Sequence, residues 1–253
     1  MNRFNHVLIT GASSGIGEAL AIYYASNGTK LLSLCGRNEE RLNKVAEQCR
    51  KGGAQVEVRV VDVSDASVVE AWIKESNKKM PLNLVFANAG VATLEETSEN
   101  VRRTFNINVM GVVNTVLPTI ELYKKAPSSQ LKHIAITSSI AGYHGMPTCP
   151  SYSATKAGIK AWGEGLRLSL APLGIRVSTI CPGFIRSRIT DKNTCPMPYF
   201  MEADRAAEII ATRIDKNIGL IAFPWQMRLA TWLGSILPNC ISDFIYSKLP
   251  YKV

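Results

Sequence analysis

A serine, a tyrosine and a lysine in the middle of the chain have the types and spacing of an acid–base site. Ser139 follows an apolar run, and Tyr152 and Lys156 come soon after it. If residues 151–172 form a helix, Tyr152 and Lys156 share one helix face. A phenol titrates near 10 in water, so proton exchange near neutral pH requires a pKa shift of ~3 units, or ~4 kcal/mol. One cation about 4 Å away in a partly desolvated cleft supplies on the order of 4 kcal/mol, so Lys156 could provide most of it.

The same pair has a purely structural alternative. Tyr152 could pack at the start of a helix against the core, with Lys156 as a solvated surface charge, because Tyr-x-x-x-Lys alone is a weak pattern. Of the eight tyrosines, only Tyr152 has a lysine four residues further on. The choice depends on whether the rest of the chain supplies something for the pair to act on.

A glycine-rich turn near the start of the chain predicts a phosphate-binding element. Residues 6–10 read as a strand, and an amphipathic stretch runs to about residue 27 after the turn. Strand, glycine turn and helix together form the usual cradle for a dinucleotide, whereas a plain glycine-rich turn is the alternative. Here Gly11 would allow the tight turn, and Gly15 would let the backbone approach a pyrophosphate closely. Gly17 would allow the helix to pack closely on the strand. The predicted cofactor contacts of this turn are Gly11, Ser13, Ser14, Gly15, Ile16 and Gly17.

Arg37 and Asn38 follow the second predicted strand, residues 30–35. NAD-binding chains usually have a carboxylate about 20 residues past the last motif glycine, where it binds the ribose 2′-hydroxyl. A guanidinium at this place suits a 2′-phosphate instead, and Ser13 could add a hydroxyl contact. The sequence therefore favours NADP(H) over NAD(H). The alternative is that Arg37 is a solvated residue at the start of the next helix.

Strand-like and helix-like runs alternate along the chain, which predicts an α/β fold with a doubly wound parallel sheet and helices on both faces. The predicted strands are 6–10, 30–35, 56–63, 82–90, 131–137, 174–183 and 219–223. The predicted helices after the first are 38–51, 65–77, 98–124, 151–172 and 203–217. Ligands bind at the carboxyl ends of such strands. The residues expected there are Asp62, Val63, Asn88, Ala89 and Gly90.

We expect one domain over residues 1–253, with a substrate loop or lid at 184–201 and a helical extension at 224–253. The extension is amphipathic and contains Trp225 and Trp232, but Pro224, Arg228 and Pro238 interrupt it too much for a membrane span. Packing on its own domain or on a neighbouring subunit is favoured over contact with a membrane surface.

Composition restricts the partners and the compartment. The net charge is +9, but no basic run reaches five residues, so nucleic acid is an improbable partner and anionic small molecules, an acidic carrier protein or a membrane surface fit better. The six cysteines lack Cys-x-x-Cys spacing, which predicts reduced thiols in a cytoplasmic protein and neither a disulfide frame nor a metal site. The first residues lead straight into a strand, so no signal peptide is expected.

Taken together, these motifs resemble the short-chain dehydrogenase/reductase family over about residues 5–223, in family order and at family spacing. The residues that carry the resemblance are Thr10-Gly-Ala-Ser-Ser-Gly-Ile-Gly17, Asn88-Ala-Gly90, Asn108, Ser139, Tyr152-Ser-Ala-Thr-Lys156 and Pro182-Gly183. The probability that all of these motifs agree by chance is negligible, although each motif alone is a weak signal. The resemblance implies a Rossmann-like fold and a nicotinamide cofactor.

The resemblance also implies roles for individual residues. Tyr152 would be the general acid or base, and Lys156 would lower its pKa and hold the nicotinamide ribose. Ser139, and not Ser138, would bind the substrate oxygen. Asn108 would hold a water in a proton relay and disturb the long helix locally. The residues that would enclose the nicotinamide are Pro182, Gly183, Ile185 and Ser187.

The expected function is NADP(H)-dependent interconversion of a carbonyl and a secondary alcohol, with a lipophilic ketone or a 3-oxoacyl compound as the substrate class. Two alternatives remain: an NAD-dependent alcohol dehydrogenase of the same family, and a non-catalytic NADPH-binding interaction protein. The helices at 98–124 and 151–172 resemble those that pair between family subunits, so a homodimer or homotetramer is expected.

Overall fold

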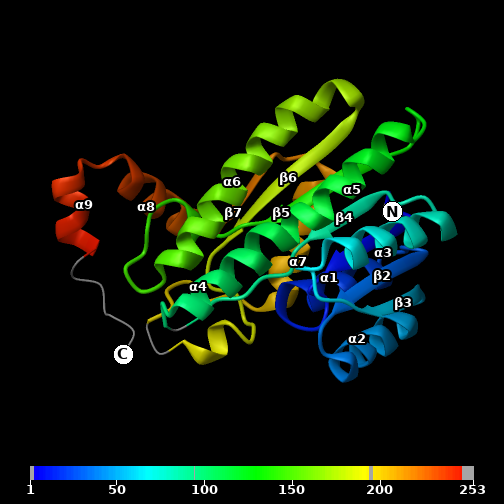
Figure 1. Ribbon diagram of the computed structural model, residues 1–253, viewed down its shortest axis with the longest axis horizontal. Coiled ribbons are helices and arrows are strands. Elements are labelled where there is room, and N and C mark those ends of the chain that lie inside the picture. Colours follow the sequence, from blue (N-terminus) through cyan, green and yellow to red (C-terminus); the bar gives the residue numbers. More distant parts are fainter. Residues whose placement is uncertain (1–2, 94, 194–195, 247–253) are drawn as a thin grey trace.

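Seven parallel strands form one sheet in the order β3-β2-β1-β4-β5-β6-β7 (Figure 1). The structure is a computed structural model that describes residues 3–93, 95–193 and 196–246. The strands are β1 (His6–Thr10), β2 (Leu31–Gly36), β3 (Gln55–Val60), β4 (Leu84–Ala87), β5 (Lys132–Thr137), β6 (Ile175–Pro182) and β7 (Leu220–Phe223). The predicted doubly wound parallel sheet is thus confirmed.

Helices cover both faces of this sheet (Figure 1). One layer contains α1, α2 and α7, and the other contains α3, α4, α5 and α6. The helices are α1 (Gly15–Ser26), α2 (Glu39–Lys51), α3 (Ala66–Lys79), α4 (Ser98–Phe105), α5 (Gly111–Lys125), α6 (Pro150–Leu170), α7 (Ala203–Asp215), α8 (Trp225–Ile236) and α9 (Asn239–Tyr246).

Burial explains why the central strands read as continuous apolar runs. Every residue of β1, β4 and β5 is buried, because helices pack against both faces of a parallel sheet. Helix α2 shows the complementary pattern, with Leu42, Val45, Ala46 and Cys49 buried on one side of an otherwise polar helix. Two apolar cores result, one on each side of the sheet.

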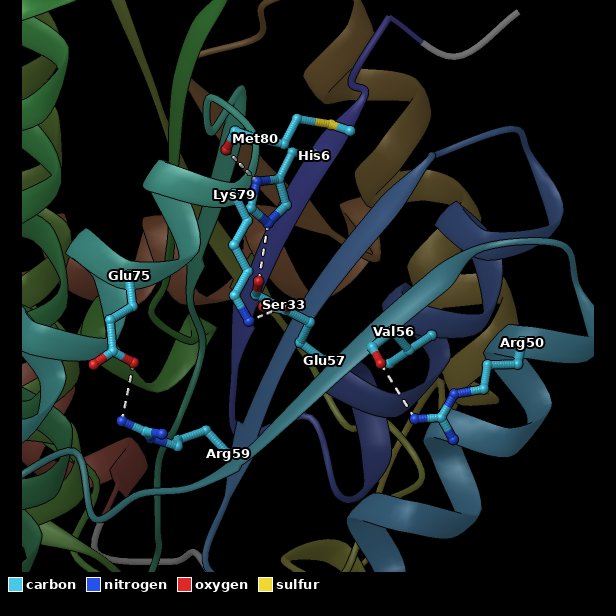
Figure 2. A network of polar contacts seen from close by, with 9 residues as sticks. All are labelled: His6, Ser33, Arg50, Val56, Glu57, Arg59, Glu75, Lys79 and Met80. Atoms are coloured by element: carbon cyan, nitrogen blue, oxygen red, sulfur yellow. Dashed lines mark hydrogen bonds and ion pairs between the residues drawn. The ribbon is translucent and has the colours of Figure 1, made fainter.

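The amino-terminal half of the sheet is tied to its helices by polar contacts (Figure 2). The buried His6 ring on β1 contacts the Met80 carbonyl (2.8 Å) and the Ser33 hydroxyl on β2 (2.9 Å). On the edge strand β3, Glu57 pairs with Lys79, and the side chain of Arg50 donates to the Val56 carbonyl (3.2 Å). The contact from Arg50 occupies a backbone acceptor on the edge strand, which is a position where another chain could otherwise pair.

The predicted strand 56–63 is shorter in the structure. Pairing of β3 with β2 ends where Gly36 faces Val60, because β2 itself ends there. Asp62 and Val63 consequently lie in the connection to α3 and not on the strand. Their place at the carboxyl edge of the sheet is unchanged, since the connection leaves from that edge.

The predicted single helix at 98–124 is interrupted by a π-helical segment, Asn106–Met110. Helices α4 and α5 flank it and continue in nearly the same path (Figure 1). The segment contains Asn108, as expected from a local disturbance at that residue. Such π-helical insertions mark functional sites in many proteins.

The loop at 184–201 returns to the sheet edge, where Ile185 pairs with Met201 and Arg186 binds the Glu202 carboxylate through two nitrogens. Residues 194–195 lie outside the described part of this loop, and residues 247–253 outside that of the helical extension. Helix α8 has no buried residue, and α8 and α9 lie at one end of the molecule (Figure 1). Within the ranges that the structure describes, no helix is long and apolar enough to cross a membrane.

Candidate active site

The glycine-rich turn between β1 and α1 is packed so closely that side chains do not fit. Gly11 and Gly15 have φ values of +68° and +60°, which glycine adopts without strain. A Cβ on Gly17 would lie 2.3 Å from the Gly11 carbonyl oxygen, and one on Gly11 would lie 2.8 Å from Ala89 Cα. The Asn88 amide group donates to the Thr10 carbonyl (3.1 Å) and so ties β4 to the turn.

The first turn of α1 is suited to binding an anion. Ser14 precedes the helix, and its side chain makes no capping hydrogen bond. The amides at a helix start lack partners within the helix and attract negative charge. A Cβ on Gly15 would lie 2.8 Å from Ser187 Cβ, so the loop after β6 approaches the turn. Ile16 packs against the core, so a cofactor contact from Ile16 would come from its backbone.

Arg37 lies at the carboxyl end of β2 with its side chain exposed. A Cβ on the preceding Gly36 would lie 3.1 Å from the Ser13 hydroxyl, which places Ser13 beside this strand end. Asn38 caps α2 by accepting from the Arg41 amide (2.9 Å). The charge of Arg37 also lowers the pKa of Asp62, so these two residues belong to the same part of the sheet edge. This arrangement fits a phosphate group beside Ser13 and Arg37.

Asp62 and Val63 are held by neighbouring polar groups. Partial burial acts to raise the pKa of Asp62, but hydrogen bonds from Ser64 and the charges of Arg37 and Arg103 outweigh it, and the net shift is downwards. The Val63 carbonyl accepts from the Asn114 side chain on α5 (2.9 Å). This is the partner that an asparagine within an apolar helix requires.

Tyr152 and Lys156 lie on one face of α6, next to the end of β5. The Lys156 ammonium donates to the Thr137 carbonyl (2.9 Å) and lies 5.6 Å from the centre of the Tyr152 ring. The hydroxyl of Ser139 lies beside the Tyr152 phenol and acts to lower its pKa. A Cβ on Gly90 would lie 3.4 Å from Lys156 Nζ, so the end of β4 reaches the same site.

The two adjacent serines have different environments. Ser138 donates to the Lys156 carbonyl (2.6 Å), which fixes α6 against β5. Ser139 instead accepts from the Ala141 amide (3.1 Å) and contacts the phenol. Only Ser139 therefore has its hydroxyl beside Tyr152, which agrees with the choice made from spacing.

Asn108 connects three segments beneath the site. Its side-chain oxygen accepts from the Val91 amide (2.8 Å), and its amide group donates to the Val91 carbonyl (2.9 Å) and to the Thr155 hydroxyl (3.2 Å). Asn108 is fully buried. It thus links the π-helical segment, the loop after β4 and α6. Thr155 had no distinguishing signal in the sequence except its place inside the Tyr152–Lys156 interval.

The end of β6 completes the site. The Pro182 carbonyl accepts from Ser139 (3.4 Å). A Cβ on Gly183 would lie 3.0 Å from the sulfur of Met227, so this glycine lets α8 approach the site. The Ile185 side chain is buried in the core, which leaves only its backbone to face a ligand. Sequence reasoning missed Met227, because nothing local to α8 indicates its contact with β6.

Comparison with known proteins identifies the family. Residues 5–196 match the short chain dehydrogenase family. An uncharacterized oxidoreductase of Myxococcus xanthus is 34% identical over 248 residues, which covers 95% of each chain. The chain belongs to the short chain dehydrogenase family. As a member, it is an oxidoreductase acting on alcohol or carbonyl groups.

A plant protein and a solved structure are also similar to this chain. An 11-beta-hydroxysteroid dehydrogenase-like protein of Arabidopsis thaliana is 32% identical over 249 residues, covering 93% of this chain and 81% of the plant protein. A solved short-chain dehydrogenase from Sphingobium yanoikuyae in complex with NADPH superposes with a TM-score of 0.79 at 25% identity, covering 97% and 96% of the two chains.

The electrostatics of this dehydrogenase site differ from the sequence-based expectation. Desolvation raises the pKa of Tyr152 to about 12, although the hydrogen bond from Ser139 acts to lower it. Desolvation also lowers the pKa of Lys156 to about 8. The expected lowering of the phenol pKa by Lys156 is therefore not found in the protein alone. Burial weakens the tendency of Lys156 to carry charge and also opposes ionisation of the phenol.

Cys181 is a further group near the pair, and sequence reasoning did not place it there. Its thiol acts electrostatically on both Tyr152 and Lys156, and burial raises its pKa to about 11. The thiol is therefore neutral at physiological pH. The only sequence feature that could have placed Cys181 near the site is its position directly before Pro182.

These pKa values predict how the rate of carbonyl reduction depends on pH. We expect reduction to use a protonated Tyr152 and a cationic Lys156, and Lys156 loses its proton first as the pH rises. We expect kcat/KM to be constant below about pH 8 and to fall above it, measured from about pH 6 to about pH 10 at saturating cofactor. Circular dichroism at each pH serves as the control for folding. A flat profile up to about pH 10 would contradict the role of the Lys156 charge.

Proposed function

We propose that this short chain dehydrogenase is an NADP(H)-dependent reductase of a lipophilic carbonyl compound. The observation that carries the proposal is the Tyr152 phenol, which burial holds protonated at neutral pH and which lies beside Ser139 and Lys156. A neutral phenol is a proton donor, which suits reduction of a carbonyl to an alcohol.

Each group in this mechanism has one task. Bound NADPH supplies the hydride to the carbonyl carbon. Ser139 donates a hydrogen bond to the carbonyl oxygen, and Tyr152 gives that oxygen its proton. The Lys156 ammonium stabilises the phenolate that remains and binds the ribose hydroxyls. The link between Asn108, Thr155 and the loop after β4 holds α6 in place for these steps.

The opposite direction requires a different protonation state. Oxidation of an alcohol uses Tyr152 as a base, and a pKa of about 12 leaves little phenolate at neutral pH. The NAD-dependent alcohol dehydrogenase therefore remains the second candidate, supported only by the reversibility of the reaction class.

NADP(H) is favoured by the charge at the end of β2. Arg37 is exposed at the place where a ribose-binding carboxylate is usual, and Ser13 lies beside the strand. The residues proposed to hold the cofactor are Gly11, Ser13, Ser14, Gly15, Ile16, Gly17, Arg37, Asn38, Asp62, Val63, Asn88, Ala89, Gly90, Tyr152, Lys156, Pro182, Gly183, Ile185 and Ser187.

A lipophilic substrate is supported by a groove of about 610 Å³ between α6, β7 and α8. Its walls are mainly aromatic and aliphatic, and they include Tyr143, which follows Ser139 by four residues. The residues that line it are Tyr143, Lys160, Leu220, Trp225, Arg228, Leu229 and Trp232. The Arabidopsis relative is named for hydroxysteroids, and a rat relative is named an estradiol 17-beta-dehydrogenase.

A homodimer or homotetramer is part of the proposal. Large apolar side chains are exposed on the α4–α5 layer and on α6, among them Phe105, Leu117 and Leu168. Exposed apolar side chains on neighbouring helices are typical of subunit contacts. Helix α8 also exposes apolar side chains, and packing on its own domain or on a neighbouring subunit is favoured over contact with a membrane surface. A reducing, cytoplasmic location is supported by five free thiols among the described residues.

Replacing the catalytic phenol tests the mechanism. Tyr152→Phe removes the proton donor, so we expect kcat for NADPH-dependent reduction of a ketone panel to fall ~10²–10⁴-fold. Binding of NADPH, measured by fluorescence titration, should stay within about twofold because the phenyl ring is kept. Tyr23→Phe in α1 is the matched control and should behave as wild type. Wild-type turnover in Tyr152→Phe would exclude the mechanism, and no turnover by wild type despite NADPH binding would favour the interaction-protein alternative.

Reversing the charge at the end of β2 tests the cofactor preference. Arg37→Asp removes a charge-assisted contact worth about 1.5–3 kcal/mol, so KM for NADPH should rise ~10–100-fold while KM for NADH does not. Lys51→Asp, at the far end of α2, makes the same change in net charge and serves as the control. An unchanged ratio of the two KM values in Arg37→Asp would show that Arg37 does not bind the 2′-phosphate.

Light scattering tests the assembly. The wild-type protein at micromolar concentration should have two or four times the chain mass of 27.7 kDa. Leu168→Asp should shift it towards the monomer, because the charge would be buried in the contact. Val68→Asp on α3 is the control, and a monomeric wild type would refute the assembly.

A further inference from the structure

The first turn of α6 contains Tyr152, yet the residue before the helix does not cap it. Cys149 occupies the capping position and makes no side-chain hydrogen bond to the helix. A carboxylate from elsewhere takes this place: Glu96 Oε1 accepts from the Ser151 amide (3.1 Å) and from the Ser151 hydroxyl (2.8 Å). A carboxylate at a helix start both satisfies a free amide and interacts favourably with the helix dipole.

Glu96 is itself held in place by the segment between β4 and α4. The next residue, Thr97, caps α4 by accepting from the Asn100 amide (3.2 Å). The Asn100 side chain turns back and donates to the Glu95 carbonyl (3.1 Å). Because backbone on both sides of Glu96 is fixed by the start of α4, its carboxylate is presented from an ordered turn, although the side chain is solvent-exposed.

Ser151, the other half of the contact, is buried. Without the Glu96 oxygen, the Ser151 amide and hydroxyl would both lose a partner, and because Ser151 is buried this loss favours a rearrangement of the turn. On the other side of Tyr152, Ser153 is tied separately: its hydroxyl accepts from the Met146 amide (3.2 Å). Both neighbours of Tyr152 are thus anchored, and each by a different part of the chain.

We propose that Glu96 is a positioning residue for Tyr152 and acts through Ser151. The inference rests on the proposed function of Tyr152 as proton donor. Glu96 contacts Ser151 and none of the reacting groups, but the turn that it fixes sets where the phenol lies relative to Ser139. A displacement of about 1 Å at a reacting group can cost ~10²-fold in rate, so a modest shift of this turn is enough to matter.

The same contact joins the two halves of the site. The chain after β4 first passes Asn88 and Ala89 at the glycine-rich turn, then Val91 at Asn108, and then reaches α6 through Glu96. Glu96 therefore sets the first turn of α6 relative to the chain segment that borders the cofactor side.

Three variants test the proposal in the full-length protein. Glu96→Ala removes the acceptor, and kcat for the carbonyl reduced by wild type should fall ~10–100-fold while KM for NADPH stays within about twofold. Glu96→Gln keeps an acceptor oxygen at the same reach and should restore kcat to within about threefold of wild type. Glu95→Ala, the neighbouring exposed glutamate, is the matched control and should equal wild type.

Hydrogen exchange gives a readout that does not depend on turnover. Backbone amides at 151–155 should exchange faster in Glu96→Ala than in wild type, and at the wild-type rate in Glu96→Gln and Glu95→Ala. Should Glu96→Ala fail to fold, Ser151→Ala deletes only the hydroxyl contact. It should change kcat and the exchange rates at 151–155 in the same direction but by a smaller amount.

Two results would overturn the inference: wild-type kcat and exchange in Glu96→Ala, or equal impairment of Glu96→Gln and Glu96→Ala. Failure of the proposed function looks different. In that case Tyr152→Phe stays active, or wild type reduces no carbonyl. The exchange rates at 151–155 then still decide whether Glu96 holds the first turn of α6.

Discussion

The close contact of backbone between the glycine-rich turn and the end of β4 is the constraint on which the site depends. No Cβ fits at Gly11 or Gly17, and Asn88 ties the two segments with its side chain. This contact lies where the sheet order changes direction, between β1 and β4, and it places the start of α1 and the loop after β4 side by side. The remaining parts of the site are arranged around that loop: Asn108 holds it from below, and Glu96 extends it to α6.

Desolvation determines the chemistry available to the pair on α6. Both groups are driven towards their neutral forms, since burial raises the pKa of Tyr152 and lowers that of Lys156. The phenol therefore starts as an acid, and the Ser139 contact favours its ionised form only as a smaller opposing effect. At Tyr152 the loss of water on burial outweighs the effects that favour the phenolate, so the net pKa shift is upwards.

The sheet and most of the site could be predicted because their signals are local. Alternating strand and helix patterns predicted the parallel sheet, and the glycine spacing predicted a turn that the structure confirms at Gly11 and Gly15. The sequence predicted that β3 would extend beyond Val60, because apolar residues continue there. In the structure β3 ends at Val60, because its partner strand β2 ends at Gly36. Helix α8 was expected to be packed, but its apolar pattern does not say against what; in the structure Met227 contacts the end of β6, and no residue of α8 is fully buried.

The sequence by itself determined the fold class and the family and selected the candidate site residues, Ser139 among them, because periodicity and motif spacing are properties of short segments. Only the tertiary structure decided in which direction the pKa values move and that Glu96 contacts the first turn of α6. Each of these depends on segments tens of residues apart, and 55 positions separate Glu96 from Ser151. Such contacts, and the water they exclude, are set by packing and leave no pattern in the chain.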